Sequence, residues 1–419
     1  MDIQSYRRLF FFCLFLSLLV SILYFQAQIP AYTSDPNDSP SYAVTPRKFM
    51  GHNDLRGGQA PREKFTIIRF MHSRLKSMSQ ETEPPNDVTE FCQVPYDCIV
   101  YSDLNKYLPI SELHNFSAAL VGGPGKKRSE VFLRSMGIDV DHRPRGQYWI
   151  SLDSESAINP GVRSSITPYT QTNINWTATH GDNVTFYFGG TNTEKLKTPT
   201  PPHQVENEAR KFFNNKTKLV CWAMSNCGLT WTNRNQLAID LIKNMPSDDS
   251  FHFFGSGTSC LAQAKGRFVE HGKVAGKQVG LQAEIKDCFF YLSFENSNCS
   301  HYITEKFGNG LGGHAVPIVN GWRQSYQELL PGSFIHAKDF PSGKELSEYL
   351  QYLSKNFEAY FEYHKWRQSY RINGADQWST LYCQICRKLK EEKDDGYRRQ
   401  YRVPDLKKFY TNFQTCKRD

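Results

Sequence analysis

The second half of the chain alternates short apolar runs with amphipathic segments. The apolar runs, each bounded by polar residues or glycine, predict buried strands at residues 219–225, 251–255, 287–295 and 314–321. Residues 236–245 and 301–311 place apolar side chains at helical spacing and predict helices. Strands separated by helices within about 30 residues form βαβ units, so we expect a mostly parallel, Rossmann-like sheet. Such a sheet binds its ligand at the carboxyl ends of its strands.

The first half carries a weaker version of the same pattern. Residues 98–103, 117–123 and 146–152 predict strands or turns of a first α/β domain. Residues 197–204, KTPTPPHQ, are too rich in proline to sustain a helix or a central strand, and they predict a domain boundary. The predicted order is a first domain at 89–200, a second domain at 205–385 and a C-terminal tail at 386–419.

The amino-terminal residues have the pattern of a membrane anchor. Residues 9–25 are uncharged and almost wholly apolar, and Arg7 and Arg8 precede them. As a helix this run spans roughly 25 Å, which suits a thin bilayer of the early secretory pathway. By the positive-inside rule, residues 1–8 form a cytoplasmic tail and the rest of the chain is lumenal. A cleavable signal peptide is the alternative, but no small-residue cleavage pattern follows the run.

A stem is predicted between the anchor and the first domain. Residues 26–88 are rich in proline, serine, aspartate and glycine, a composition that favours an extended spacer over a packed core. Within them, residues 65–75 predict a local helix. We expect continuous ordered structure from about Thr89.

Cysteines and sequons support the lumenal location. The chain has eleven cysteines, which predict disulfides in an oxidising compartment. Sequons for N-linked glycans occur at Asn37, Asn115, Asn175, Asn183, Asn215 and Asn298. The net charge of +8 is spread along the chain, and the sequence has no zinc spacing, Walker loop or basic stripe. We therefore expect an anionic small ligand and no nucleic acid as partner.

The passage from 289 to 321 holds the candidate chemistry. A predicted strand delivers Glu295 and Asn296 to its carboxyl end, and the following helix carries Glu305 and Lys306 in its first turns. The free N–H groups and the positive dipole of a helix start favour an anion, and Lys306 adds a point charge. Glu305 is able to accept hydrogen bonds from sugar or ribose hydroxyls. The alternative is that Glu305 and Lys306 are only an exposed pair on a helix surface.

The same passage carries a family pattern. It resembles the donor-binding signature of glycosyltransferase family 10, the α1,3/4-fucosyltransferases, in FENS (294–297), YITEK (302–306) and VPIVNG (316–321). The resemblance continues through SFIHAKDF (333–340), HKWR (364–367) and CQIC (383–386), and it includes the upstream elements INWT (174–177) and WAMSNC (222–227) with Arg234.

This resemblance implies a fold and an activity. The implied fold is GT-B, an α/β architecture of two Rossmann-like domains facing a cleft, with GDP-fucose held by the second domain and the acceptor by the first. The implied reaction is an inverting transfer of L-fucose to the 3-hydroxyl of N-acetylglucosamine in a glycoprotein glycan. The implied donor-binding residues are Asn226, Arg234, Glu295, Asn296, Tyr302, Glu305 and Lys306. The signature holds no DxD-type carboxylate pair, so we expect neither a required divalent metal nor a tightly bound cofactor.

The resemblance does not identify a single residue as the catalytic base. The acceptor hydroxyl needs a carboxylate within hydrogen-bond reach to take its proton. In the family, a glutamate in an ESP-like turn of the first domain supplies it, and residues 148–159 match that region without an intact ESP. Glu155 fits by residue type and Asp153 by its distance from Trp149, so both remain candidates.

Further positions depart from the family pattern. His180 and Gly181 stand where the family commonly has Tyr and Arg, and His301 stands where an acidic residue is usual. Glycines at 308, 310, 312 and 313 are expected to weaken the helix that carries Lys306. The contacts to donor and acceptor therefore differ in detail from the family pattern.

The resemblance also implies two long-range disulfides. By similarity, Cys92 and Cys98 bridge to Cys383 and Cys386 and tie the last helices to the first domain. The spacing does not choose a pairing, because four cysteines allow three connectivities. Each such bridge is expected to stabilise the fold by about 2–5 kcal/mol.

Two other functions stay open from the sequence. A related transferase that uses another nucleotide sugar would share the architecture. A catalytically silent lumenal glycan-binding protein is suggested by the imperfect ESP turn, although it would have no need of phosphate-binding cations. The leading prediction is a single-pass type II Golgi membrane protein whose partners are GDP-fucose and a glycan acceptor, with a core or an antennal N-acetylglucosamine equally possible.

Overall fold

The computed structural model describes residues 62–69, 86–102, 115–122, 146–164, 166–181, 183–225, 227–228, 230–255, 258–272, 277–372, 377–397 and 402–418. All of them belong to one compact unit, Arg56–Asp419. The predicted tail and anchor, most of the stem, Asn37 and Asn226 lie outside the described residues. Within the described ranges, no helix is long and apolar enough to span a bilayer.

The first lobe is built on a seven-stranded sheet. The strand order is β2-β3-β1-β4-β5-β6-β7, and all pairs are parallel except β2 with β3. The strands are β1 (Lys64–Arg69), β2 (Asn86–Asp87), β3 (Asp97–Ser102), β4 (Ala118–Gly122), β5 (Tyr148–Leu152), β6 (Trp176–Thr179) and β7 (Phe186–Tyr187).

Strand β1 corrects the prediction for the end of the stem. Residues 65–75 were expected to include a local helix, but Lys64–Arg69 is a strand between β3 and β4. Phe65 points to one face of the sheet and Ile68 to the other, and both are buried. A short apolar run buried on both sides has no periodicity that separates strand from helix. The first lobe therefore includes a segment that was assigned to the stem.

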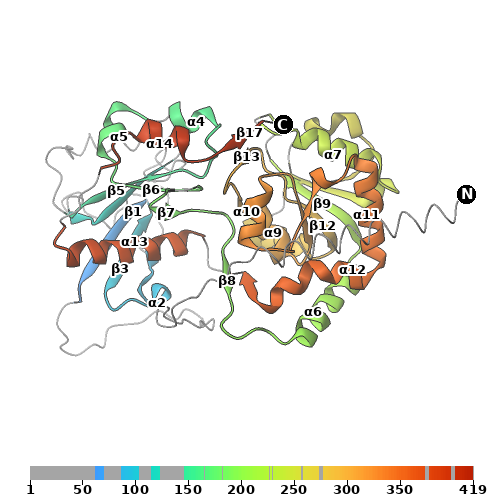
Figure 1. Cartoon of the computed structure of the whole chain (residues 1–419), viewed down its shortest axis with the longest axis horizontal. Coiled ribbons are helices and arrows are strands. Elements are labelled where there is room, and N and C mark those ends of the chain that lie inside the picture. The colour runs from blue at the N-terminus through green and yellow to red at the C-terminus, as the bar shows by residue number, and fades with distance from the viewer. Residues whose placement is uncertain are drawn as a thin grey trace, which may run out of the picture. The chain divides into compact units, whose positions relative to one another are not determined.

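Helices from the far end of the chain cover the first sheet. One face packs on α13 (Gln377–Asp394), and the other on α14 (Leu406–Asn412), as Figure 1 shows. The shorter helices of this lobe are α2 (Thr89–Cys92), α4 (Pro160–Ser164) and α5 (Pro168–Asn173). Helices α13 and α14 are thus part of the first lobe and its core.

Five disulfides join the ten cysteines of the described residues. Cys92–Cys383 and Cys98–Cys386 attach α13 to α2 and β3, the segments that the family resemblance links. The other three are Cys221–Cys288, Cys227–Cys260 and Cys299–Cys416.

The second lobe is built on a six-stranded, fully parallel sheet. Its order is β11-β10-β9-β12-β14-β15, the Rossmann order, which confirms the predicted parallel sheet. The strands are β9 (Lys218–Met224), β10 (Phe251–Gly255), β11 (Val269–His271), β12 (Cys288–Leu292), β14 (Val316–Val319) and β15 (Ile335–His336).

Helices flank this sheet and two small ribbons complete the fold. The helices are α6 (Pro202–Asn215), α7 (Arg234–Lys243), α8 (Lys277–Ile285), α9 (Glu305–Gly312), α10 (Arg323–Leu329), α11 (Gly343–Lys355) and α12 (Phe357–Phe361), with 3-10 turns at Asp248–Ser250, Thr258–Ala264, Ala337–Asp339 and Glu362–Gln368. The ribbons pair β13 (Asn298–Cys299) with β17 (Cys416–Lys417) and β8 (Thr193–Lys195) with β16 (Tyr370–Ile372).

The glycines of α9 pack the helix instead of breaking it. A methyl group added at Gly310 would meet Tyr291 and Pro317 at 3.2 Å, and one at Gly308 would meet Thr191 at 3.0 Å. The absent side chains let α9 lie close on the sheet. This tertiary packing overrides the low helix propensity of glycine.

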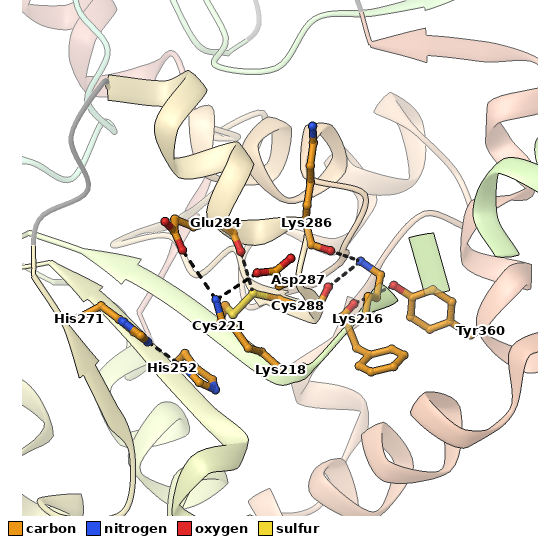
Figure 2. Close-up of a disulfide and its surroundings, with 11 residues drawn as sticks. Lys216, Lys218, Cys221, His252, His271, Glu284, Lys286, Asp287, Cys288 and Tyr360 are labelled. Atoms are coloured by element: carbon orange, nitrogen blue, oxygen red, sulfur yellow. Dashed lines mark hydrogen bonds and ion pairs between the residues drawn. A yellow bond between two sulfur atoms is a disulfide. The ribbon is translucent and has the colours of Figure 1, made fainter. Parts of the chain in front are cut away.

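A disulfide and two lysines connect β9 with β12 and the residues that precede these strands (Figure 2). The buried Lys216 Nζ donates to the carbonyls of Lys286 (3.1 Å) and Cys288 (2.8 Å), and burial lowers the pKa of Lys216 to about 7. Lys218 Nζ lies 3.4 Å from a carboxylate oxygen of Asp287. The two strands whose carboxyl ends lead to the candidate site are therefore locked together at the opposite edge.

The fold separates the sequons into two groups. Asn115, Asn183 and Asn215 are exposed, whereas Asn175 and Asn298 are only 5% and 8% exposed. We expect glycans on the first three and none on the buried pair, because a glycan needs its amide nitrogen at the surface. Glycosidase release in heavy-oxygen water with peptide mass spectrometry measures this, and a glycan on Asn175 of the folded protein would contradict it.

Candidate active site

The candidate site lies where three segments meet. The turn after β5 brings Glu155 from the first lobe. The loop after β12 and the start of α9 bring Tyr302 and Lys306 from the second lobe, and the start of α7 brings Arg234. The Tyr302 hydroxyl donates to Glu155 Oε2 at 3.5 Å, and the loop before α7 is joined to the loop after β12 by the Trp231 N–H, which donates to the Asn296 carbonyl at 2.7 Å.

Glu295 supports the site from beneath. It follows β12 and is fully buried. Its Oε1 accepts hydrogen bonds from the N–H and the hydroxyl of Thr304, both at 2.8 Å, and its Oε2 lies 3.2 Å from Lys306 Nζ. Burial raises the pKa of Glu295, and Lys306 opposes that shift. In this structure Glu295 contacts Thr304 and Lys306, and the donor contact predicted for it stays a prediction.

Lys306 presents a fixed positive charge at the start of α9. Its Nζ donates to Thr304 Oγ1 at 2.7 Å and lies 3.4 Å from Glu305 Oε1. Burial disfavours the ammonium, but Glu295 and Glu305 outweigh burial and raise the pKa of Lys306. Its side chain is 22% exposed and that of Glu305 is 55% exposed, so both reach the surface of the site. A held ammonium at the positive end of a helix dipole is suited to an anion.

Arg234 adds a second cation. It is the first residue of α7 and is 4% exposed. Burial lowers the pKa of Arg234, while the negative charges of Glu295 and Glu155 and the hydroxyl of Tyr302 oppose that shift. Arg234 also acts on Lys306, whose pKa it lowers by repulsion. The two predicted phosphate-binding cations therefore lie in one electrostatic cluster.

The turn after β5 separates the two base candidates. Asp153 is 4% exposed, and its Oδ1 accepts the N–H of Glu155 at 3.1 Å, which closes an Asx turn. Glu155 is half-buried, and its Oε2 accepts hydrogen bonds from Asn159 Nδ2 at 3.2 Å and from the Tyr302 hydroxyl at 3.5 Å. Asp153 thus shapes the turn, and Glu155 faces the second lobe.

The other predicted residues have smaller roles in this arrangement. Asn296 is half-buried, its Oδ1 accepts from Ser297 Oγ at 3.2 Å, and its carbonyl accepts the N–H of Trp231 at 2.7 Å. Asn226 falls outside the described residues. Among the residues the structure describes, no three or more metal-ligating side chains gather in one place.

Sequence reasoning missed the contacts that join the lobes here. Ser156 and Ser297 hydroxyls lie 2.6 Å apart, both fully buried. Gly190 N–H donates to the carbonyl of Ile303 at 3.1 Å, and a methyl group on Gly190 would lie 2.0 Å from the N–H nitrogen of Glu305. The Gly–Gly pair at 189–190 could have indicated the second of these contacts, since glycine next to a strand is typical of a close approach between backbones. Nothing in the sequence pattern indicated the serine pair.

Burial of His180 predicts that acid destabilises the folded state. It is 2% exposed, its ring centroid lies 5.1 Å from that of Tyr302, and burial lowers its pKa from 6.5 to about 4. The unfolded chain therefore binds a proton on His180 before the folded chain does. The free energy of unfolding should fall between pH 6.5 and pH 4, by about 3 kcal/mol in total from this residue, and should not change from this residue outside that window.

Urea unfolding at pH 7.0 and pH 4.5 measures this effect. The loss between these two pH values should shrink by about 2 to 3 kcal/mol in His180→Gln. The exposed His203→Gln is the matched control and should behave as wild type. Equal losses in wild type and His180→Gln would show that His180 does not titrate in this way.

A family model matches the second lobe and the helix α13 that follows it. Residues 213–409 match the family model for glycosyltransferase family 10 (fucosyltransferase), C-terminal domain. The matched range is slightly less than half of the chain. The matched range includes α7, β12 and α9, and with them Arg234, Tyr302 and Lys306.

Curated relatives share part of the chain. The 4-galactosyl-N-acetylglucosaminide 3-alpha-L-fucosyltransferase 9 of Bos taurus and that of Homo sapiens are each 30% identical over 254 residues, which is 60% of this chain and 62% of the relative. The alpha-(1,3)-fucosyltransferase 4 of Homo sapiens is 31% identical over 257 residues, 60% of this chain and 44% of the relative. The aligned part thus spans less than two thirds of these relatives. A crystal structure of an alpha1,3-fucosyltransferase with GDP-fucose is 14% identical, with a TM-score of 0.42 over 81% of this chain and 94% of that one.

Proposed function

We propose that the chain is an inverting α1,3-fucosyltransferase that transfers L-fucose from GDP-fucose to the 3-hydroxyl of N-acetylglucosamine in a glycoprotein glycan. The family 10 match and the printed activities of the relatives support this class of reaction. The observation that carries the proposal is the contact of Glu155 with Tyr302, in the same cluster as Arg234 and Lys306. A base and an anion site on facing lobes are what a sugar transfer from a nucleotide requires.

In this proposal the second lobe holds the donor. Lys306 and Arg234 bind the pyrophosphate, and Glu305, Tyr302 and Asn296 orient the ribose or fucose hydroxyls. Glu295 holds Lys306 and the first turn of α9 in place. Fixed cations matter most at the leaving group, because negative charge grows there as the bond to GDP breaks.

The first lobe supplies the base. Glu155 takes the proton of the acceptor 3-hydroxyl, the oxygen attacks C1 of fucose, and the C1–O bond to the diphosphate breaks with its electron pair leaving on GDP. A single in-line displacement converts the β-linked donor into an α-linked product. No step in this sequence needs a metal, so we expect transfer in EDTA.

The setting of the protein is part of the proposal. We place it in the Golgi membrane as a single-pass type II protein, anchored by residues 9–25, with a GT-B arrangement of the two lobes in the lumen. Five disulfides among the described residues support an oxidising compartment.

The test uses the full chain in detergent. We would incubate it with GDP-fucose and glycopeptides that carry either a core or an antennal N-acetylglucosamine, with and without EDTA, and detect addition of one deoxyhexose by mass. Nuclear magnetic resonance of the product then reads the α1,3 linkage. Transfer from a different nucleotide sugar would favour a related transferase, and no transfer from any donor would favour a lumenal glycan-binding protein.

A further inference from the structure

The end of the chain is anchored first to the first lobe. Helix α14 packs its buried Tyr410 on the sheet, where the Tyr410 hydroxyl lies 2.8 Å from Ser151 Oγ at the end of β5. At the start of the helix, Gln171 Nε2 donates to Asp405 Oδ1 at 2.7 Å. The residues that follow α14 therefore leave from a fixed point close to the turn that carries Glu155.

Residues 413–417, the C-terminal strap, then join the second lobe. Strand β17 pairs with β13 (Figure 1). The Cys299–Cys416 disulfide lies within this pair. Thr415 and Ser300 are also linked twice, by Ser300 N–H to the Thr415 carbonyl (2.8 Å) and by Thr415 N–H to Ser300 Oγ (3.0 Å). The strap is thus fixed to the loop that leads into Tyr302.

One side chain of the strap bridges the two lobes. Gln414 is 8% exposed, its Oε1 accepts the N–H of Ala157 at 2.9 Å, and its Nε2 donates to the carbonyl of Ser300 at 3.0 Å. Ala157 is two residues from Glu155, and Ser300 is two residues from Tyr302. A primary amide suits this position because it is at once a donor and an acceptor.

The first lobe leaves room for the strap at Gly181. This residue has φ +115°, and a methyl group there would lie 2.4 Å from the carbonyl oxygen of Phe413. Only glycine allows both the backbone angle and the approach. The position that departs from the family pattern is therefore the one on which the strap rests.

We propose that Gln414 is a positioning residue that holds the turn of Glu155 at a set distance from the donor loop of Tyr302. This inference rests on the proposed function, because it assigns Glu155 and Tyr302 to the two sides of one reaction. The strap lies beyond residue 409, where the family match ends.

Geometry explains why the bridge matters for rate. A base displaced by about 1 Å from its productive position loses on the order of 10²-fold in rate. Removal of the Gln414 amide frees the Glu155 turn from the donor loop at that bridge, while Lys306 and Arg234 keep their own contacts. The expected effect is on turnover and not on the binding of GDP.

The test compares Gln414→Ala, Gln414→Glu and the control Thr411→Ala, an exposed residue of α14. We expect Gln414→Ala to lower kcat about 10²-fold, with the KM for GDP-fucose within about threefold of wild type. Calorimetry should still give one GDP per chain, so that the loss is not a loss of folded protein. Thr411→Ala should match wild type. An unchanged kcat in Gln414→Ala, or a fall in GDP stoichiometry equal to the fall in kcat, would overturn the proposal.

Hydrogen exchange gives a readout that needs no turnover. The Ala157 amide should exchange faster in Gln414→Ala but stay protected in Gln414→Glu, since the carboxylate still accepts its hydrogen bond while the bond to Ser300 is lost. A wild-type chain without transfer from any nucleotide sugar would defeat the proposed function alone. The positioning role would still be overturned by Ala157 exchange that is the same in Gln414→Ala and wild type.

Discussion

Replacing Glu155 with glutamine should lower kcat for fucosyl transfer by about 10²- to 10⁴-fold, the usual effect of losing a general base. Glutamine keeps the size of the side chain and can still bond the Tyr302 hydroxyl, but it cannot accept a proton from the acceptor. The KM for GDP-fucose should change little, because Lys306 and Arg234 are untouched. Initial rates with GDP-fucose and a saturating glycopeptide measure the effect.

Asp153→Asn is the matched control for this change. Asparagine keeps the Oδ1 that accepts the N–H of Glu155, so the turn should survive and kcat should fall less than about tenfold. A larger loss in Asp153→Asn than in Glu155→Gln would assign the base to Asp153. Full turnover in both variants would show that the base lies outside this turn.

Replacing Lys306 with methionine should reduce kcat by about 10²- to 10³-fold, as expected when one fixed donor to a developing negative charge is lost. The same change should lower the free energy of unfolding by about 3 kcal/mol, because it leaves the fully buried Glu295 without its cation. Initial rates and urea unfolding measure the two effects separately. Wild-type turnover in Lys306→Met would remove this residue from the donor site.

A double variant separates catalysis from stability. Glu295→Gln together with Lys306→Met replaces the buried ion pair by neutral groups, and glutamine still accepts the N–H of Thr304. We expect the free energy of unfolding to return to within about 1 kcal/mol of wild type while kcat stays low. Recovery of turnover in the double variant would mean that Lys306 only compensates Glu295 and does not act on the donor.

The sequence predicted secondary structure best where the hydrophobic pattern of a segment fitted only one type of element. The runs that became β9, β10, β12 and β14 are bounded by glycine or polar residues and alternate with helices, so the parallel sheet followed from them. The sequence did not predict strand β1. Its apolar run, FTII, is too short to show the periodicity that distinguishes a strand from a helix. Helix α9 was undervalued because local propensity takes no account of the sheet on which its glycines pack.

The site shows the same division. The residue pattern indicated Glu305 and Lys306, the family resemblance added Arg234 and Tyr302, and their roles stay predictions. The pattern and the resemblance did not tell a buried carboxylate from an exposed one, so Glu295 was grouped with residues that face the surface of the site. The choice between Asp153 and Glu155 depended on one turn hydrogen bond, and the bridge through Gln414 joins residues more than a hundred positions apart. Such contacts exist only once the chain has folded.

Both long-range disulfides close over most of the chain, with separations of 291 and 288 residues, and α13 and α14 cover the two faces of the first sheet. The amino-terminal lobe therefore cannot be finished as it emerges from the ribosome, although domains commonly fold in order of synthesis. Its sheet must wait, with apolar faces open, until nearly the whole polypeptide has been made. A premature stop codon before the end of α13 would leave the first lobe without both covering helices and expose it to chaperones and degradation.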